Sequence, residues 1–356
     1  MTEKNINKKI LLLTASYWAW HNVAANTLEK YYKDRWYETK IIDLVDFIDN
    51  FTWKTTQSFY QDFCSKYPKI WEKTFNILDN KKIKEIIFST SYPIYQKKFN
   101  KLINEYNPNI VLSIFPFWGI FIKNNIDKNW KNYKSWIIIT DSIKIHSIWY
   151  LEWDYIDKYF VIDEYSKEKF INKFEHKKDN VIVSFFPIDK KYFIVKKKIN
   201  NKNIYILLTW LDEKYIINVL KLLVETSYNI KIIKWRNDLL YKKLQNIFLY
   251  NNIEFIDFLK LLDNYKNIGI FIWKAWWATM SECIATDTPV IVPTFIPWQE
   301  EGNIKLINKW EVWFYEPDWF KSYLLVKYID WNKLLNNFKK IKKINSCDII
   351  YNSFWK

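Results

Sequence analysis

The sequence predicts an α/β fold with two Rossmann-like domains that face a central cleft. Short apolar runs of strand length alternate with longer helical stretches along most of the 356 residues. The runs are continuously apolar, which is typical of parallel strands covered by helices on both faces of a sheet. One hydrophilic stretch divides the alternation into two halves of ordinary domain size. Ligands of such domains bind at the carboxyl ends of the strands, where we therefore expect the functional residues.

The first half opens with a complete βα unit. Residues 10–13 predict a strand, and residues 23–33 predict the helix that follows it. Four further strands are expected at residues 39–43, 110–115, 136–140 and 159–162. These elements define an N-terminal domain over residues 1–190.

A polar segment separates the two halves. It contains Lys196, Lys197 and Lys198 among several asparagines, and it predicts a linker over residues 191–202. The second domain, residues 203–340, has a helix at residues 214–225 and strands at residues 204–208, 230–233, 253–255, 268–271 and 290–292. Residues 341–356 form a tail, and we expect a helix from residue 339 onward to pack back across the hinge.

Glycine is nearly absent from the chain, and tryptophan is abundant. There are 3 glycines and 21 tryptophans, whereas a globular chain of this length has about 7% glycine, or roughly 25 residues. Many tryptophans stand at junctions between strands, loops and helices, where positive φ angles or close backbone approach favour glycine. Trp18 and Trp20 flank Ala19 just after the first strand, and Trp276 and Trp277 precede a helix.

One mechanism explains both the composition and the positions. The codon UGA encodes tryptophan in some genetic codes and glycine in another that certain bacterial lineages use. We therefore hypothesise that most tryptophans of this sequence are glycine in the native protein. Trp71, Trp118 and Trp149 are exceptions, because bulky residues suit their neighbours in the sequence. Three positions stay unassigned: Trp319, Trp331 and Trp355.

The formal net charge of the chain is +15 and comes mainly from lysine. Arg35 and Arg236 are the only arginines, and isoleucine and asparagine are abundant, which is the composition that an AT-rich genome produces. The lysines therefore form either a scattered solvated surface or a surface that attracts anionic lipid headgroups. Binding of nucleic acid is the third alternative.

Several features bear on the cellular location. Cys64, Cys283 and Cys347 lack the spacing of paired or metal-binding cysteines, which favours reduced thiols in the cytosol. No apolar run is long enough to span a membrane. The polar start leads directly into a strand, unlike a signal peptide. We expect a cytoplasmic protein that lies peripherally on the inner face of the cell membrane.

The first candidate loop covers residues 14–21, TASYWAWH, which become TASYGAGH when glycine is restored. It joins a strand to a helix, where bare backbone amides and the helix N-terminus can approach an oxyanion or a substrate. His21 would lie in the first helical turn and face the cleft. A histidine that only caps the helix is the alternative.

The second candidate loop covers residues 273–282, WKAWWATMSE, which become GKAGGATMSE. It follows a strand and opens a helix, so its amides and the helix dipole could contact a diphosphate. Glu282 could accept hydrogen bonds from ribose hydroxyls. A plain βα turn with a surface glutamate is the alternative.

The third candidate loop contains Pro297, Trp298, Gln299, Glu300 and Glu301, and it follows the strand at residues 290–292. Amide and carboxylate groups suit sugar hydroxyls, which both donate and accept hydrogen bonds. The alternative is a loop whose acidic residues are simply solvated.

Together with Thr140, Asp141, His146 and Trp149, these motifs resemble those of the diacylglycerol glycosyltransferases. That group belongs to glycosyltransferase family 28 and includes plant monogalactosyldiacylglycerol synthase and the bacterial processive diacylglycerol glucosyltransferases. The resemblance covers roughly residues 8–320. It implies a GT-B fold in which the second domain binds a UDP-sugar and the first domain binds the lipid acceptor, such as diacylglycerol.

The resemblance also implies a role for each matching residue. The expected donor-binding residues are Arg236, Ala275, Trp276, Trp277, Ala278, Thr279, Glu282, Gln299 and Glu300. The expected acceptor-binding residues are Trp18, Ala19, Trp20, His146 and Trp149. His21 and Asp141 are the expected catalytic residues.

The chain departs from the family pattern at two places. Plant members carry an aspartate before the glycine loop, a candidate general base, where this chain has Ser16. The base is therefore open between His21 and Asp141, and we favour His21 because imidazole titrates near neutrality. The turn at residues 209–212 is shorter than the family's, so Arg236 could supply the charge that contacts phosphate.

The family implies direct displacement of UDP by an acceptor hydroxyl, with inversion at the anomeric carbon. No His/Asp cluster has metal-ligand spacing, so we expect neither a metal nor another cofactor. Two alternatives stay open. The chain could transfer N-acetylglucosamine to another lipid-linked acceptor or epimerise a UDP-sugar, or it could be a basic nucleic-acid-binding protein. The last alternative lacks any compact aromatic and basic recognition motif, and we expect no nucleic acid partner.

Overall fold

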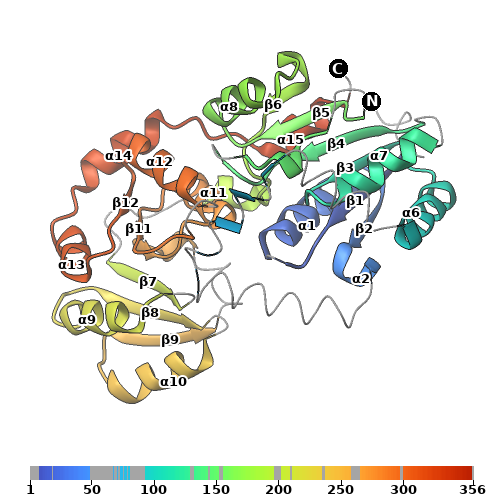
Figure 1. Ribbon diagram of the computed structural model, residues 1–356. Coiled ribbons are helices and arrows are strands. Elements are labelled where there is room, and N and C mark those ends of the chain that lie inside the picture. Colours follow the sequence, from blue (N-terminus) through green and yellow to red (C-terminus); the bar gives the residue numbers. More distant parts are fainter. Residues whose placement is uncertain are drawn as a thin grey trace. The chain divides into compact units, whose positions relative to one another are not determined.

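The chain forms two compact units. The first contains residues 1–188, 296–302 and 344–356, and the second contains residues 189–295 and 303–343. The computed structural model (Figure 1) describes residues 8–17, 19–48, 67, 70, 73–74, 76–77, 79–80, 93–128, 132–142, 145–151, 155–195, 202–208, 211–234, 237–257, 265–296 and 300–354. Everything that follows concerns these residues.

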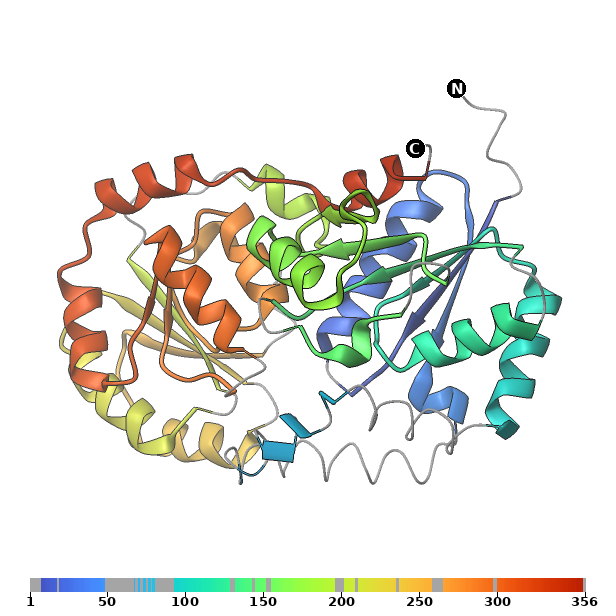
Figure 2. The ribbon, with the colours of Figure 1, turned by 45° about the horizontal axis from the view of Figure 1, so that its top comes forward.

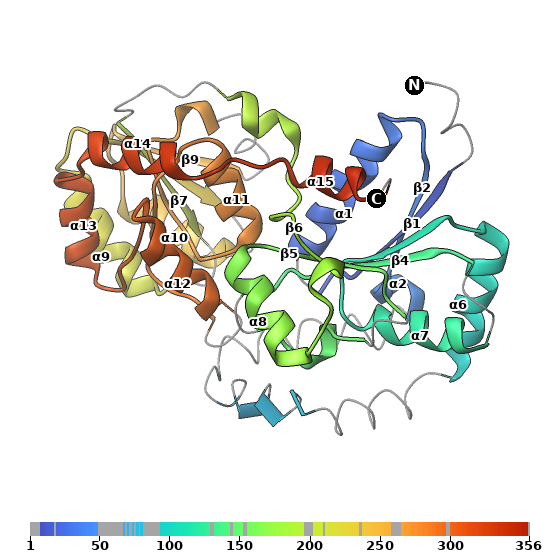
Figure 3. The same ribbon diagram turned by 90° about the horizontal axis from the view of Figure 1, so that it is seen from above.

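The first unit is built on a parallel six-stranded sheet with the order β2-β1-β3-β4-β5-β6. The strands are β1 (Lys9–Thr14), β2 (Glu38–Asp43), β3 (Ile110–Ser113), β4 (Lys134–Ile138), β5 (Lys158–Val161) and β6 (Val181–Val183). The helices are α1 (Ala19–Lys33), α2 (Leu44–Ile48), α6 (Pro93–Tyr106), α7 (Trp118–Lys128), α8 (Glu164–Phe174) and α15 (Ser346–Asn352). Figure 3 shows α6 and α7 on one face of the sheet and α1 and α15 on the other.

Residues of β1 and β3 are buried because both strands have neighbours on each side and helices on each face. Leu12 pairs with Ile41 of β2 and with Leu112 of β3. All four residues of β3 are buried. This explains why the two strands are continuously apolar in sequence.

Helix α1 ends in a motif that places Trp36 in the left-handed region, at φ 64°. The amide of Tyr37 donates to the carbonyl of Tyr32 (3.2 Å), and the amide of Trp36 donates to the carbonyl of Lys33 (3.0 Å). This is the Schellman pattern, in which the residue at the position of Trp36 is most often glycine. A side chain in this conformation costs roughly 1–2 kcal/mol. The indole gains little packing in return, because Trp36 is 80% exposed.

The second unit has its own parallel six-stranded sheet, with the order β12-β11-β10-β7-β8-β9. Its strands are β7 (Asn203–Leu208), β8 (Asn229–Lys234), β9 (Ile253–Asp257), β10 (Ile270–Ile272), β11 (Val290–Val292) and β12 (Trp313–Tyr315). Its helices are α9 (Glu213–Leu223), α10 (Asp238–Ile247), α11 (Trp277–Ala285), α12 (Glu301–Trp310), α13 (Trp319–Lys327) and α14 (Trp331–Lys340). The order of the strands is that of the Rossmann fold.

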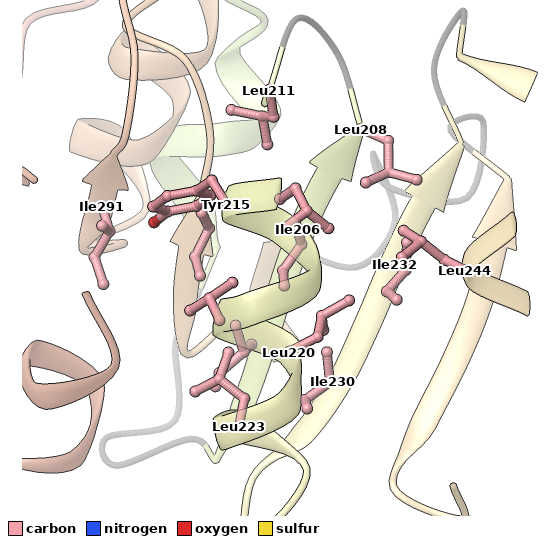
Figure 4. Packing of buried hydrophobic residues seen from close by; sticks show 14 of the residues in the cluster. Ile206, Leu208, Leu211, Tyr215, Leu220, Leu223, Ile230, Ile232, Leu244 and Ile291 are labelled. Atoms are coloured by element: carbon pink, nitrogen blue, oxygen red, sulfur yellow. The ribbon is translucent and has the colours of Figure 1, made fainter. Parts of the chain in front are cut away.

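One apolar cluster holds α9 against this sheet (Figure 4). Ile206 and Leu208, two residues apart, lie on the same face of β7 and belong to the same cluster as Leu220 of the helix. Buried residues recur along α9 at a helical period, from Tyr215 to Leu223. The helix begins at Asp212, whose carboxylate accepts a hydrogen bond from the amide of Tyr215 (2.8 Å).

The structure confirms the predicted α/β fold with two parallel sheets, and it differs from the expected elements in three places. Strands β6 and β12 were not predicted, because each has only three residues. The last part of the chain is not one helix, since α14 ends at Lys340 and α15 begins after Asn345. Residues 191–194, placed in the linker by sequence, belong to a short 3-10 helix, η3 (Lys190–Ile194).

The last residues complete the first unit. The hydroxyl of Tyr31 on α1 hydrogen-bonds to the carboxylate of Asp348 on α15. The Tyr351 ring lies 6.2 Å from that of Tyr32 and 6.1 Å from that of Tyr37. Figure 2 shows α15 beside α1. Residues 296–302, which sequence placed in the second domain, also belong to this first unit.

Candidate active site

The predicted loops lie at the positions where parallel α/β sheets bind ligands. In the first sheet, the direction of strand progression reverses between β1 and β3, and the TASYWAWH loop follows β1. In the second sheet, it reverses between β7 and β10, and the WKAWWATMSE loop follows β10. At such a reversal the connections leave to opposite faces and open a crevice outside the strand ends.

Asp43, at the end of β2, holds the first loop in place. Its Oδ1 accepts from the backbone amide of Ser16 (3.1 Å), and its Oδ2 accepts from the Ser16 hydroxyl. The side-chain amide of Asn22 donates to Ser16 Oγ (2.8 Å) and to Asp43 Oδ2 (3.3 Å). A carboxylate therefore lies beside Ser16, at the position where the plant family members have an aspartate in the loop. It comes from a neighbouring strand, so the loop sequence alone gave no sign of it.

His21 lies in the first turn of α1, as predicted, but its side chain is buried and does not face an open site. It is 4% exposed. Its ring centroid lies 5.2 Å from that of Phe115, 5.4 Å from that of Trp20 and 6.4 Å from that of Trp149. Burial lowers the pKa of His21 to about 3, against smaller opposing effects of the Ile114 backbone and Asp43. In the chain as printed His21 does not titrate near neutrality, because aromatic rings, that of Trp20 among them, exclude the water that would solvate an imidazolium.

Asp141 follows β4 and has the more suitable pKa. The indole nitrogen of Trp149 donates to Asp141 Oδ2 (2.6 Å). Burial raises the pKa of Asp141 to about 6, and the Trp149 hydrogen bond opposes that rise. A carboxylate with a pKa near the working pH is well suited to accept a proton. Trp149 thus lies between the two candidate bases, hydrogen-bonded to Asp141 and packed against His21.

His146 shapes the turn that carries Trp149. Its Nδ1 accepts from the amide of Ile148 (3.0 Å) and so caps η1 (Ser147–Trp149). The imidazole is buried, with Nδ1 3.9 Å from a carboxylate oxygen of Asp79. Asp79 in turn accepts from the amide of Ser147 (2.5 Å) and the ammonium of Lys173 (2.7 Å). In this structure His146 and Trp149 hold Asp141, and neither presents an open side chain to an acceptor.

In the second unit, the N-terminus of α11 lacks a side-chain cap. Its N-cap residue is Trp276, whose side chain makes no capping hydrogen bond. Four other helices of this unit with described N-caps, α9, α10, α13 and α14, are each capped by an aspartate or asparagine side chain: Asp212, Asn237, Asp318 and Asp330. A helix N-terminus without its own capping oxygen leaves amides for an anionic ligand.

One face of α11 is open. Trp276, Thr279 and Glu282, three residues apart, are partly exposed. The intervening residues Trp277, Ala278, Met280 and Ser281 are buried. Residues three apart lie on the same helix face, so this face carries the N-terminus at one end and a carboxylate at the other. Ala275 is fully buried, and its carbonyl accepts from the side-chain amide of Asn303 (2.5 Å).

Glu282 is held by two tyrosines. Tyr265, in η5 (Tyr265–Asn267), donates its hydroxyl to Glu282 Oε2 (2.5 Å). The hydroxyl of Tyr192 also hydrogen-bonds to Glu282. Burial raises the pKa of Glu282 to about 7, while the two hydroxyls and the charge of Lys191 oppose the rise. Glu282 thus differs from the freely solvated glutamate of the alternative, because it is partly buried and bonded to two tyrosines.

The indoles of the second loop fill its space. Trp273 is 2% exposed and Trp277 is 5% exposed. Within the described part of the chain, neither indole nitrogen has a hydrogen-bond partner. An unsatisfied buried donor costs about 1–3 kcal/mol. The Trp276 ring stands edge-on to that of Trp273, with centroids 5.2 Å apart.

At the third loop, the side chain of Glu300 bonds to the backbone of Ile296. Glu300 is 3% exposed, and its Oε2 accepts from the amide of Ile296 (2.6 Å). Gly302 follows, and a Cβ there would meet the carbonyl oxygen of Ser142 at 2.4 Å. Only glycine fits this approach, which brings the loop against the residue next to Asp141.

Three predicted site residues lie outside the described residues: Trp18, Arg236 and Gln299. Ala19 and Trp20 begin α1, and Trp20 is buried. Sequence reasoning missed Asp43, Tyr192 and Lys274. Lys274 stands in the second motif and is 1% exposed, with its ammonium 5.3 Å from the centroid of the Trp276 ring. Its position directly before the uncapped helix was a signal that the motif itself offered.

Residues 21–188 match the family model described as monogalactosyldiacylglycerol (MGDG) synthase. Over this segment, just under half of its length, the chain is similar to that family. The matched segment contains His21, Asp141, His146 and Trp149, which the motifs assigned to the acceptor half.

The similarity to curated proteins extends into the second half of the chain. The chain is 27% identical over 319 residues to a processive diacylglycerol beta-glucosyltransferase of Bacillus pumilus, covering 84% of this chain and 80% of that protein. It is 24% identical over 330 residues to the enzyme of the same name from Bacillus licheniformis, with the same coverage of each chain.

Among solved structures, the chain is similar to MurG of Acinetobacter baumannii. The TM-score is 0.62 at 9% sequence identity, over 97% of this chain and 98% of the other. This similarity concerns the fold and confirms the GT-B class. Of the helices that the structure describes, none combines the length and the apolar character needed to cross a bilayer.

Proposed function

We propose that this protein is a glycosyltransferase that moves a hexose from a UDP-sugar to a membrane lipid acceptor such as diacylglycerol. The observation that supports this most directly is the open face of α11. It combines an uncapped N-terminus with Glu282, about one and a half turns further along the helix, at the ligand-binding edge of a Rossmann sheet. The helix N-terminus suits a diphosphate, and the Glu282 carboxylate suits the hydroxyls of a ribose. The names of the curated relatives supply the acceptor class.

The proposed reaction is a single displacement with inversion. The acceptor hydroxyl oxygen forms a bond to the anomeric carbon, and the bond from that carbon to the diphosphate oxygen breaks with its electron pair leaving on UDP. The hydroxyl proton goes to a base, for which we propose Asp141. Its pKa of about 6 leaves it largely ionised at pH 7 and still basic enough to accept a proton. His21, with a pKa of about 3, is a much weaker base.

The departing diphosphate needs positive charge. The amides that begin α11 and the dipole of that helix supply part of it. Lys274 lies three residues before the first residue of that helix, and we propose that it contributes a positive charge. We propose that these groups act without a metal ion. Turnover that persists in excess EDTA supports this proposal, and loss of turnover that Mg²⁺ restores contradicts it.

We further propose that the protein works on the inner face of the cell membrane. The net charge of +15 would attract anionic headgroups. Sedimentation with vesicles that contain phosphatidylglycerol, compared with purely zwitterionic vesicles, tests this. Equal binding to both would contradict it.

The central test is a donor panel assayed against diacylglycerol in detergent. Peptide sequencing of protein from the native host first establishes which tryptophan positions hold glycine, and the assayed chain carries those native residues. Transfer from UDP-glucose or UDP-galactose to diacylglycerol supports the proposal. Conversion of UDP-N-acetylglucosamine without acceptor would instead indicate an epimerase, and transfer only to another lipid-linked acceptor would correct the substrate.

A further inference from the structure

The segment that links β6 to β7 contributes a buried tyrosine to the second unit. Asp189 caps η3 by accepting from the amide of Lys191 (3.0 Å). Tyr192 is 3% exposed, and its ring packs edge-on against that of Tyr265 at 5.1 Å. A buried aromatic side chain is unexpected in a polar linker. Its position is explained by Glu282, to which its hydroxyl bonds.

Among the residues that the structure describes, two tyrosines occupy about half of the acceptor capacity of Glu282. A carboxylate has about four acceptor sites, and the hydroxyls of Tyr192 and Tyr265 occupy two of them. About two sites are left for further donors. Glu282 lies on the open face of α11, so those sites can be reached by a ligand. A pair of adjacent hydroxyls on one ring would fill them.

We infer that Tyr192 and Tyr265 are positioning residues that hold the Glu282 carboxylate for the two neighbouring ribose hydroxyls of the nucleotide donor. This inference rests on the proposed function and deepens it, since it makes the interdomain segment part of the donor site. Two fixed hydroxyl donors prevent rotation of the carboxylate and keep its remaining lone pairs directed toward the ligand. They also favour the ionised form of a buried acid.

The same arrangement makes ribose recognition depend on pH. The charged and titratable groups around Glu282 are Tyr192, Tyr265, Lys191 and Cys283. When the carboxylate is protonated, it loses acceptor capacity toward the ribose. The contribution of the ribose hydroxyls should therefore be present above pH 7 and fall as the pH drops through the pKa of about 7.

The test compares binding of UDP and 2′-deoxy-UDP by calorimetry in the native chain and in three variants. Tyr192→Phe and Tyr265→Phe each remove one hydroxyl from Glu282. Tyr215→Phe is the matched control, because that buried hydroxyl donates to Ser322 Oγ (2.9 Å) in the same unit without contacting Glu282. We expect Tyr192→Phe and Tyr265→Phe to weaken UDP about tenfold, to weaken 2′-deoxy-UDP much less, and the control to change neither.

Each outcome separates the two proposals. If the native chain does not bind UDP, the proposed function fails. If it binds UDP and the two variants weaken UDP and 2′-deoxy-UDP equally, or weaken neither, the positioning role is overturned. Should both variants unfold, the native chain still decides: the preference for UDP over 2′-deoxy-UDP must shrink as the pH falls from 8 to 6, and a constant preference refutes the inference.

Discussion

The first unit buries the indole of Trp149, and the loop before α11 in the second unit buries indoles too, but the hydrogen bonding of their nitrogens differs. Trp149 donates to Asp141 (2.6 Å), and Trp118, in the same unit, donates to the carbonyl of Thr14 (2.7 Å). Trp273 and Trp277 bury their nitrogens with no partner among the described residues. Buried donors are normally satisfied in native proteins. The first pair therefore has the contacts of tryptophans in a native fold, whereas the second pair does not.

This difference sharpens the glycine hypothesis, because it separates the tryptophans by contact and not only by position in sequence. Trp313 resembles Trp118 and Trp149, since its indole nitrogen donates to the carbonyl of Thr288 (3.0 Å). Trp136 resembles Trp273 and Trp277, since its nitrogen has no partner in the described part of the chain. Trp36 adds an independent criterion through its left-handed backbone. We expect native peptides to show tryptophan at 118, 149 and 313, and glycine at 36, 136, 273, 276 and 277.

The largest effect should come from replacing Trp273, Trp276 and Trp277 by glycine together in the chain as printed. The indoles fill the space beside the α11 N-terminus, so UDP binding should rise by on the order of a hundredfold or more once bare backbone is exposed. Calorimetry with UDP measures this. Trp149→Gly is the control and should destabilise the fold by about 3–5 kcal/mol. Equal UDP affinity before and after the triple change would contradict the comparison.

The next effect concerns the two candidate bases. Asp141→Asn should lower kcat by about 10²–10⁴-fold, the range typical of a lost general base, with little change in the affinity for the donor. His21→Phe should lower kcat far less, because an imidazole with a pKa of about 3 accepts protons poorly. Steady-state kinetics of both variants decides the order. A larger loss in His21→Phe would return the role of base to the histidine.

A smaller effect is expected from Trp149→Phe, which keeps an aromatic ring and removes the hydrogen bond to Asp141. That bond opposes the rise of the Asp141 pKa, so its loss should raise the pKa above about 6. Asp141 must be ionised to act as a base, and activity falls as the pH drops through this value. The acidic limb of the kcat profile should therefore move to higher pH. Trp118→Phe is the matched control. An unchanged acidic limb of the kcat profile in Trp149→Phe would contradict the assignment of that limb to Asp141.

The smallest effect should come from Trp36→Gly. Glycine adopts a φ of 64° without the penalty of a side chain, so the free energy of unfolding should rise by roughly 1 kcal/mol relative to Trp36→Ala. Denaturant unfolding of the two variants measures the difference. Equal stability would mean that this backbone position does not discriminate glycine from other residues.

Sequence predicted the sheets and the site loops because the signals were local. Continuous apolar runs marked β1 and β10, and the clustered tryptophans marked the turns after them. What it missed depends on contacts between distant residues. Asp43 reaches Ser16 from another strand, and Tyr192 lies in a stretch whose polar composition predicted only a linker. The burial of His21 could not be predicted from its local sequence either, because Phe115 and Trp149, which pack against it, are distant in the chain.

The return of the chain to the first unit at residues 344–356 has a consequence for synthesis. Tyr31, Tyr32 and Tyr37 gain their aromatic neighbour Tyr351 only after the whole second unit has been synthesised. A premature stop codon before position 344 would thus damage the half of the protein that is translated first.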